Sequence, residues 1–185
     1  MIPTLLETQT AIGHYLTALG ADRYHLRLVN FAMDKSIPVT YTAEQFGKPG
    51  TAGYLRKMNY EGFNIYARPV GWQYVLLDDL TRPVLADLAT LNPCALVETS
   101  PANYQAWLIL GDVPPDRDTA KAICRELAQR FGADPAAADP DHVGRVPSFQ
   151  NLKEKYYQAD GRYPVVKLHR WEHRVSTFTP QGGLC

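Results

Sequence analysis

Two adjacent carboxylates, Asp78 and Asp79, end the apolar run YVLLDDL. The apolar residues before them are typical of a buried β-strand, so we expect the pair at a strand end. Because side chains alternate along a strand, Asp78 would share a face with Leu76, and Asp79 with Leu77. Carboxylates at strand ends hold the cations of two-metal phosphoryl transfer about 4 Å apart. The alternative is that Asp79 helps Thr81 to begin a helix while Asp78 is solvated, and spacing leaves both interpretations open.

A second acidic cluster follows a helical segment, where GADPAAADPDH contains Asp134, Asp139 and Asp141. Asp-Pro steps are typical of turns, so a structural role for these residues stands beside a metal-binding one. Spacing does not indicate which of the three would join Asp78 and Asp79.

Several basic side chains have the chemistry to contact phosphate, although each alone also fits a solvated surface. They are Arg56, Lys57, Arg68, His142, Arg145, Lys153 and Lys155. Arg68 is the most informative, because it ends a predicted strand beside the one that carries the Asp pair. Tyr66, Tyr104 and Trp107 lie on predicted strands, where they either stack on bases or belong to the core. The sequence contains neither G-x-G-x-x-G nor a Walker lysine, and its histidines lack the partners of a zinc site.

The 185 residues predict one domain, and the composition is that of an ordinary globular protein, with 45% hydrophobic and 21% charged residues. Formal net charge is zero, but residues 76–141 contain five Lys/Arg against eleven Asp/Glu, and residues 142–185 contain seven against three. An acidic centre followed by a basic end suits a site where carboxylates hold cations and nearby bases hold phosphates. Three widely spaced cysteines and the absence of a long apolar run favour a cytoplasmic protein without a membrane span.

Periodicity and turn residues predict the elements that position these side chains. Helices are expected over 5–19, from Thr42 to about Met58 with interruptions at its glycines and Pro49, over 81–90, and over 116–131. Strands are expected at 23–30, 37–42, 63–69, 72–80, 94–99 and 104–110, with 163–171 and 174–179 as a closing pair. This order predicts an α+β fold with helices mainly on one side of a sheet.

Four runs then resemble one family when they are taken together and in order. They are GYLRKMNYEGFNIYARP, VLLDDL, ALVETSPANYQAWL and RFGADPAAADPDHVGRVPSFQNLKEKY. They are similar to the RepB-type primases of IncQ-like plasmids, in the archaeo-eukaryotic primase superfamily, from about Leu5 to about Lys155. The resemblance implies an α+β primase core of mixed β-sheet, related to RNA-recognition folds, with helices packed on the sheet. Residues 1–185 would be a single catalytic domain without the family's C-terminal helical domain.

The resemblance also implies a set of site residues. The family's metal-binding acids match Asp78, Asp79 and Asp134, which would hold two Mg²⁺ or Mn²⁺ ions, with Asp139 as a nearby support. Gln105 or a neighbour stands where the wider superfamily has a triphosphate-binding histidine. We therefore hypothesise that Arg145 holds the triphosphate, with His142 and Lys153 close by and Arg68 also in the nucleotide or template site. Two positions depart from the family pattern: Ser148 replaces a glycine and Leu152 replaces a base.

The implied activity is a DNA primase that makes short primers on single-stranded DNA from NTPs or dNTPs, in plasmid replication or mobilisation. A plasmid helicase or relaxase is a candidate partner, the template would lie along the basic C-terminal region, and we expect a monomer. One alternative is an inactive module that only binds single-stranded nucleic acid. A second is a metal-dependent nuclease or nicking enzyme, which would require histidines or a nucleophilic tyrosine beside the acids.

Overall fold

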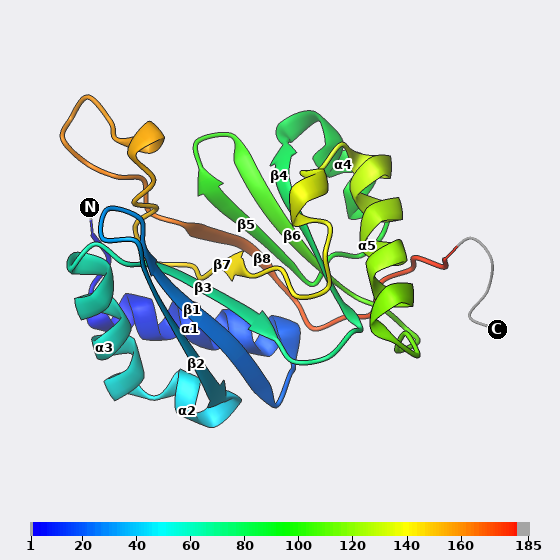
Figure 1. The fold of residues 1–185 in the computed structure, drawn as a ribbon, viewed down its shortest axis with the longest axis horizontal. Coiled ribbons are helices and arrows are strands. Elements are labelled where there is room, and N and C mark those ends of the chain that lie inside the picture. Colours follow the sequence, from blue (N-terminus) through cyan, green and yellow to red (C-terminus); the bar gives the residue numbers. More distant parts are fainter. Residues whose placement is uncertain (1, 181–185) are drawn as a thin grey trace.

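The computed structural model describes residues 2–180, which form two antiparallel sheets with helices packed on them (Figure 1). The strand order is β2-β1-β3-β7 in the first four-stranded sheet and β4-β6-β5-β8 in the second. The predicted α+β class is confirmed, with two separate sheets in place of one. In the described residues, no helix is long and apolar enough to cross a bilayer.

The first half of the chain builds the first sheet and its helical cover. Helix α1 (Leu5–Leu19) begins at a Thr4/Glu7 capping box and ends at Gly20, whose φ of 62° suits glycine. A hairpin of β1 (Arg23–Asn30) and β2 (Lys35–Thr42) follows, and β3 (Asn64–Pro69) pairs with the other edge of β1. Alternate residues of β1 are buried against the helices, so one face of this sheet belongs to the core.

The helix predicted from Thr42 to about Met58 is two helices, α2 (Ala43–Gly47) and α3 (Pro49–Tyr60). The break falls at Lys48, which has an extended backbone, because the residue before a proline avoids the helical region. Pro49 then opens α3, where a missing backbone N–H costs nothing.

The adjacent strands β4 and β6 of the second sheet are buried on both faces for most of their length, which explains their almost continuous apolar runs. It contains β4 (Tyr74–Thr81), β5 (Ala95–Ser100), β6 (Asn103–Ile109) and β8 (Lys167–Trp171). Trp107 and Ile109 of β6 face the core shared with α1, whereas Ala106 and Leu108 face α5 (Arg117–Phe131). Asp116 caps α5 by accepting from the Thr119 N–H. The short β7 (Gly144–Arg145) completes the first sheet, beside β3.

Two predicted elements differ in the structure. The helix expected over 81–90 is a 3₁₀ turn, Arg82–Val84, followed by the short α4 (Leu85–Ala89), and the Thr81 side chain makes no capping hydrogen bond. The closing strand pair is wrong, because β8 pairs with β5 and residues 174–179 form no strand. The Ser176 N–H donates to the Ile109 carbonyl, and the Thr177 N–H donates to the Leu91 carbonyl. Because these backbone groups bind two other segments, residues 174–179 do not form a strand ladder with β8.

Candidate active site

A cavity of about 400 Å³ opens where the two sheets meet. Both sheets and the loops after α5 contribute to it, so it collects side chains from distant parts of the sequence. Its lining includes Arg27, Val29, Phe31, Ser36, Tyr66, Asp78, Asp79, Thr99, Gln105, Asp134, His142, Arg145, Asn151, Lys153 and Tyr156. The three predicted acids thus line the same cavity, together with Gln105, His142, Arg145 and Lys153.

A β-bulge in β4 brings Asp78 and Asp79 to the same cavity. Leu77 pairs with Ala106 of β6 and Leu80 pairs with Tyr104, so the two aspartates lie opposite Gln105 alone. Asp79 adopts the left-handed backbone conformation at φ 55°, which aspartate tolerates better than most residues. The expectation that the two carboxylates lie on opposite faces is therefore wrong, because the extra residue interrupts the alternation.

Asp78 is held in its ionised form by hydrogen bonds. Its side chain is 19% exposed, and its Oδ1 accepts from the Asp79 N–H at 2.7 Å. Burial by itself would raise the pKa of this carboxyl, but His142, Gln105 and the Asp79 N–H outweigh burial and bring the pKa below its usual value. The His142 Nε2 atom lies 3.7 Å from Asp78 Oδ2. At neutral pH Asp78 is therefore a carboxylate, the form in which it can ligate a cation.

Asp79 and Asp134 complete the acidic side of the cavity. Asp79 is exposed, and its Oδ1 accepts from the Asn103 amide at 2.9 Å. The Asp134 N–H donates to the Asp78 carbonyl at 3.0 Å, which ties the loop after α5 to the bulge. Asp134 Oδ1 also accepts from the Ala136 N–H at 2.9 Å and so caps a 3₁₀ turn. Asp134 thus has the turn role that the sequence left open, at a place that lines the cavity.

The other two acids of the second cluster are bound to α5. Arg117 donates to Asp139 at 2.9 Å and to Asp141 at 2.8 Å, and the Lys121 Nζ atom lies 2.9 Å from Asp139. Partial burial opposes ionisation of Asp139, but the Asp141 N–H, Lys121 and Arg117 lower its pKa to about 2. These ion pairs fix the loop that carries Asp134 and His142.

Arg145 is a buried cation whose direct hydrogen-bond partners are neutral. It is 3% exposed, and its guanidinium donates to Asn64 Oδ1 and to the Tyr66 hydroxyl, both at 2.8 Å. It also lies 4.7 Å from the centre of the Tyr66 ring, and its backbone N–H donates to Gln105 at 2.8 Å. Burial lowers the pKa of Arg145, but a guanidinium stays charged in proteins. A buried positive charge beside a cavity, with neutral groups as its partners, is suited to an anion.

Arg68 does not line this cavity, unlike Gln105, His142, Arg145 and Lys153. Its guanidinium donates to the carbonyls of Pro69 at 3.2 Å and Gly71 at 3.0 Å. It lines a separate hollow with His25 and Asp141. Its strand, β3, was predicted, but the expectation that this strand lies beside the one with the Asp pair is wrong, because β3 belongs to the first sheet and β4 to the second. The direction of the guanidinium depends on the loop that follows β3.

The sequence reasoning missed several polar residues of the cavity. Asn151 is fully buried and donates to the Thr99 carbonyl at 2.8 Å, and nothing in its local sequence marks it. Arg27 was detectable, because the alternation of β1 places it on the exposed face, opposite Tyr66 of β3. Ser148, which stands where the resemblance has glycine, has a φ of 76°. The backbone at this position is thus one that glycine adopts without strain.

The donor set fits divalent cations that are completed by substrate. In residues 2–180, no three His, Cys, Asp or Glu side chains form a ready metal site by themselves. Asp78, Asp79 and Asp134 nevertheless offer hard oxygen ligands to one cavity. Mg²⁺ is commonly held by one or two carboxylates, water and substrate phosphates, so an incomplete protein site is compatible with it.

Known proteins are similar to this chain over most of its length. Residues 42–179 match the family model of the RepB DNA-primase N-terminal domain. Mobilization protein A of Escherichia coli is 33% identical over 178 residues, which cover 94% of this chain and 25% of that protein. A DNA primase of Acidithiobacillus ferrooxidans is 29% identical over 177 residues, which cover 86% of this chain and 49% of that protein. The chain therefore spans about a quarter of the length of the first relative and about half of the length of the second.

Solved structures give the same result. The catalytic domain of primase RepB′ in complex with initiator DNA has a TM-score of 0.81 and 32% identity, covering 92% of this chain and 88% of that one. A second structure, primase RepB′, has a TM-score of 0.83 and 31% identity, with coverages of 92% and 58%. The archaeo-eukaryotic primase domain of the cyanophage S-2L primase-polymerase shares the fold, with a TM-score of 0.62 and 16% identity.

Proposed function

This chain belongs to the family of RepB DNA-primase N-terminal domains, and we propose that it makes short primers on single-stranded DNA by two-metal nucleotidyl transfer. The observation that carries the proposal is the bulge in β4, since it directs Asp78 and Asp79 into one cavity with Asp134 and Arg145. The relatives named as a DNA primase and as primase RepB′ support the activity.

Asp78, Asp79 and Asp134 would hold two Mg²⁺ or Mn²⁺ ions, which supply activation of the attacking 3′-hydroxyl and neutralise charge on the triphosphate. The other residues of the cavity bind and orient. Arg145 would hold the triphosphate with its preorganised guanidinium, and His142 and Lys153 would add positive charge nearby. Gln105 accepts a hydrogen bond from the Arg145 backbone N–H and also interacts with Asp78. It would therefore fix the position of Arg145 relative to the Asp78 carboxylate.

The proposed context is plasmid replication or mobilisation, with NTPs or dNTPs as substrates and a helicase or relaxase as partner. Mobilization protein A, of which the matching region is a quarter, supports a link to mobilisation. We propose that the chain acts as a monomer on its single-stranded template.

The test is primer synthesis on single-stranded DNA with labelled NTPs and either Mg²⁺ or Mn²⁺. Wild type should yield short products, and Asp78→Asn should lower the rate about a hundredfold or more, because it removes charge from a metal ligand without changing its shape. The matched control is Asp160→Asn, an exposed change whose amide oxygen can still accept from the Arg162 N–H.

Product type separates the rival functions. Cleavage of the template would indicate the nuclease alternative. One observation favours that alternative, because His142 and Tyr156 line the cavity together with the acids. Binding without any product, with both metals and several templates, would indicate the inactive module. In that case, adding the helical domain of a RepB relative in trans tests whether synthesis requires it.

A further inference from the structure

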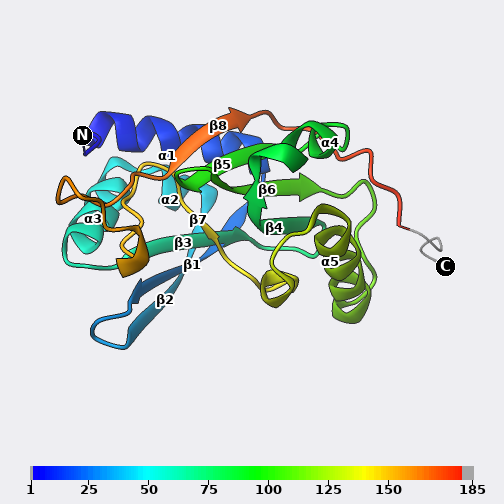
Figure 2. The same cartoon turned by 90° about the horizontal axis from the view of Figure 1, so that it is seen from above.

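The first sheet has a second, open face, opposite the one that packs on the helices. In β1 the side chains of Tyr24, Leu26 and Leu28 are buried, whereas Arg23, His25 and Arg27 alternate with them and are exposed. Figure 2 shows the hairpin of β1 and β2 extending away from the rest of the molecule, with α1, α2 and α3 on its other side. This face is therefore accessible.

The open face continues into the cavity. Arg27 pairs directly with Tyr66 of β3, whose ring lies against Arg145, and Arg27 itself lines the cavity. Directly opposed residues of an antiparallel pair share a face, so the exposed arginines of β1 and the bound Arg145 belong to one surface. A polyanion that lies across this face would contact positive charge along its whole path to the acids of the cavity.

The strands contribute no carboxylate to this face. Its members on β1, β2 and β3 are Arg23, His25, Arg27, Val29, Ser36, Pro38, Thr40, Thr42, Asn64, Tyr66 and Arg68. Asp78, Asp79 and Asp134 meet this face only at the cavity, which Arg27 and Tyr66 also line. The other acids nearby lie at its margins: Asp22 precedes β1, Asp34 is at the hairpin tip, and Asp141 shares a hollow with Arg68. Arg23 and Arg27 form no ion pair with any residue of 2–180, so their charges are available.

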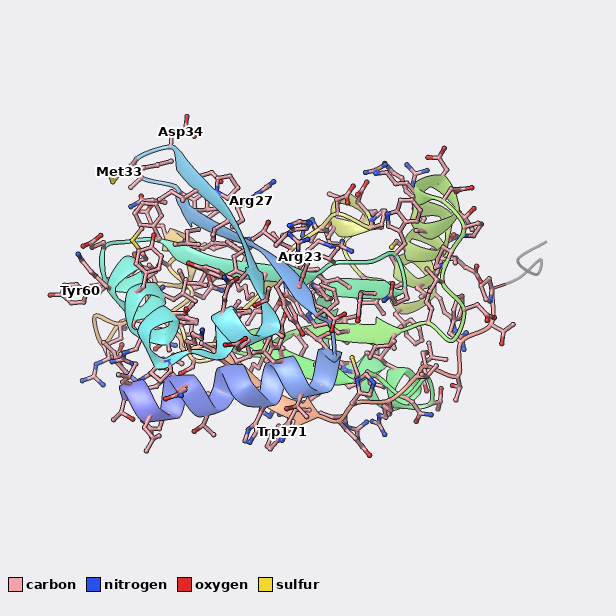
Figure 3. The ribbon with its side chains drawn as sticks, turned by 90° about the horizontal axis from the view of Figure 1, so that it is seen from below. Arg23, Arg27, Met33, Asp34, Tyr60 and Trp171 are labelled. Atoms are coloured by element: carbon pink, nitrogen blue, oxygen red, sulfur yellow. The ribbon has the colours of Figure 1, made fainter. Side chains whose placement is uncertain are left out.

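The hairpin tip adds an aromatic platform. Phe31 is 58% exposed and also lines the cavity, and Met33 beside it is 65% exposed. In Figure 3, Arg27 and Met33 lie along the same projecting hairpin. An exposed aromatic ring beside free cations is the combination that binds unpaired bases, because stacking needs a base whose face is open.

We propose that the single-stranded DNA template crosses the open face of β1 and β2, with phosphates on Arg23 and Arg27 and a base stacked on Phe31 at the mouth of the cavity. The two arginines are about 13 Å apart along the strand, so they contact different phosphates. The identity of this strand as template rests on the proposed function. Its path differs from the basic C-terminal region that the sequence favours.

The experiment measures binding of a fluorescent single-stranded oligodeoxythymidylate to the full chain by anisotropy, across a salt titration and without nucleotide. Arg23→Ala/Arg27→Ala should weaken binding about 25-fold near 0.1 M salt and reduce the salt slope by about 1.4, since each single-strand phosphate contact contributes about 0.7. The matched control is Arg162→Ala/Arg170→Ala, which removes two exposed arginines of the C-terminal region. It should change affinity less than about twofold.

A second pair of variants tests the stacking. Phe31→Ala should weaken binding about fivefold or more, and Phe31→Trp should retain it, which a purely structural role of Phe31 would not explain. Thermal melting checks that every variant is folded.

Equal losses in the two double variants, or a larger loss in Arg162→Ala/Arg170→Ala, would overturn the proposed path. Primer synthesis tests the proposed function independently of the binding measurements, which test the DNA path. If wild type makes primers and the affinity of Arg23→Ala/Arg27→Ala is unchanged, only the path is wrong. If wild type binds through Arg23 and Arg27 but makes no primers, the path stands and the function fails.

Discussion

Arg145 combines burial, charge and neutral partners at one residue. Its guanidinium donates to Asn64 and Tyr66, so it is already oriented before any anion arrives. Such preorganisation reduces the entropy that is lost when a ligand binds. We expect Arg145 to contribute more to nucleotide affinity than to the rate of the chemical step.

Arg145→Lys should raise the nucleotide KM about tenfold or more, with a smaller effect on kcat, because lysine keeps the charge but loses the planar fork. The measurement is steady-state primer synthesis at varied nucleotide concentration. Arg125→Lys, an exposed change on α5, is the control. An unchanged KM in a folded Arg145→Lys protein would remove Arg145 from the triphosphate site.

Ser148 has a strained backbone in a buried place. Its φ is 76°, and its hydroxyl lies 3.1 Å from the Thr8 hydroxyl, which joins the segment before β8 to α1. Both the strain and the hydrogen bond are of the order of 1 kcal/mol, so they nearly cancel.

Two substitutions separate these contributions. Ser148→Gly and Ser148→Ala both remove the hydroxyl, but only alanine keeps the left-handed strain. We expect the alanine variant to be about 1 kcal/mol less stable than the glycine variant in urea denaturation. Equal stabilities would mean that the backbone relaxes without cost.

At the scale of elements, α5 positions the acidic loop that it precedes. Arg117 and Lys121 on α5 bind Asp139, and the Asp134 N–H binds the carbonyl of Asp78 in β4. The helix, the loop and the bulge are thus one connected support for two of the three candidate metal ligands. Loosening Asp139 should therefore affect both stability and the metal dependence of activity.

Asp139→Asn should lower the free energy of unfolding at pH 7 by about 1 kcal/mol, since it breaks an ion-pair network at the surface. The folded pKa of Asp139, about 2, lies below the usual 3.8. The stabilisation is therefore complete above about pH 4 and is lost as the pH falls towards 2. Urea denaturation at pH 7, 4 and 3 measures this, with Asp160→Asn as control, and a difference as large at pH 3 as at pH 7 would contradict it.

At the scale of the molecule, the two sheets share one junction, and the cavity lies there. The first sheet supplies Arg27 and Tyr66, the second supplies Asp78 and Gln105, and the loops after α5 supply His142. Arg27 and Arg145 thus come from the first sheet, and Asp78 and Asp79 come from the second.

Net charge is also a property of the whole molecule, and it is zero here. We expect weak binding of single-stranded DNA with a shallow salt dependence, since few phosphates are contacted and long-range attraction is small. Anisotropy titrations between about 50 and 200 mM salt measure both. Nanomolar affinity at physiological salt would contradict this expectation.

Local chemistry determined much of this protein from sequence alone. The α5 helix followed from its apolar spacing, with Gly132 as its end, and most strands followed from their alternation or apolar runs. Asp78 and Asp79 were recognised because two charges at the end of an apolar strand need a partner. The resemblance in four ordered runs indicated the family, which the match over residues 42–179 bears out.

Pairings between distant residues were decided only by the tertiary structure. The bulge that turns Asp79 into the cavity exists because Leu80 pairs with Tyr104 of β6, and the sequence around Asp79 does not contain that information. The same reason applies to Arg68, turned away by the loop at Gly71, and to residues 174–179, bound to two other segments. Alternation and capping act over a few residues, whereas register, sheet partner and shared cavities depend on which surfaces are buried together.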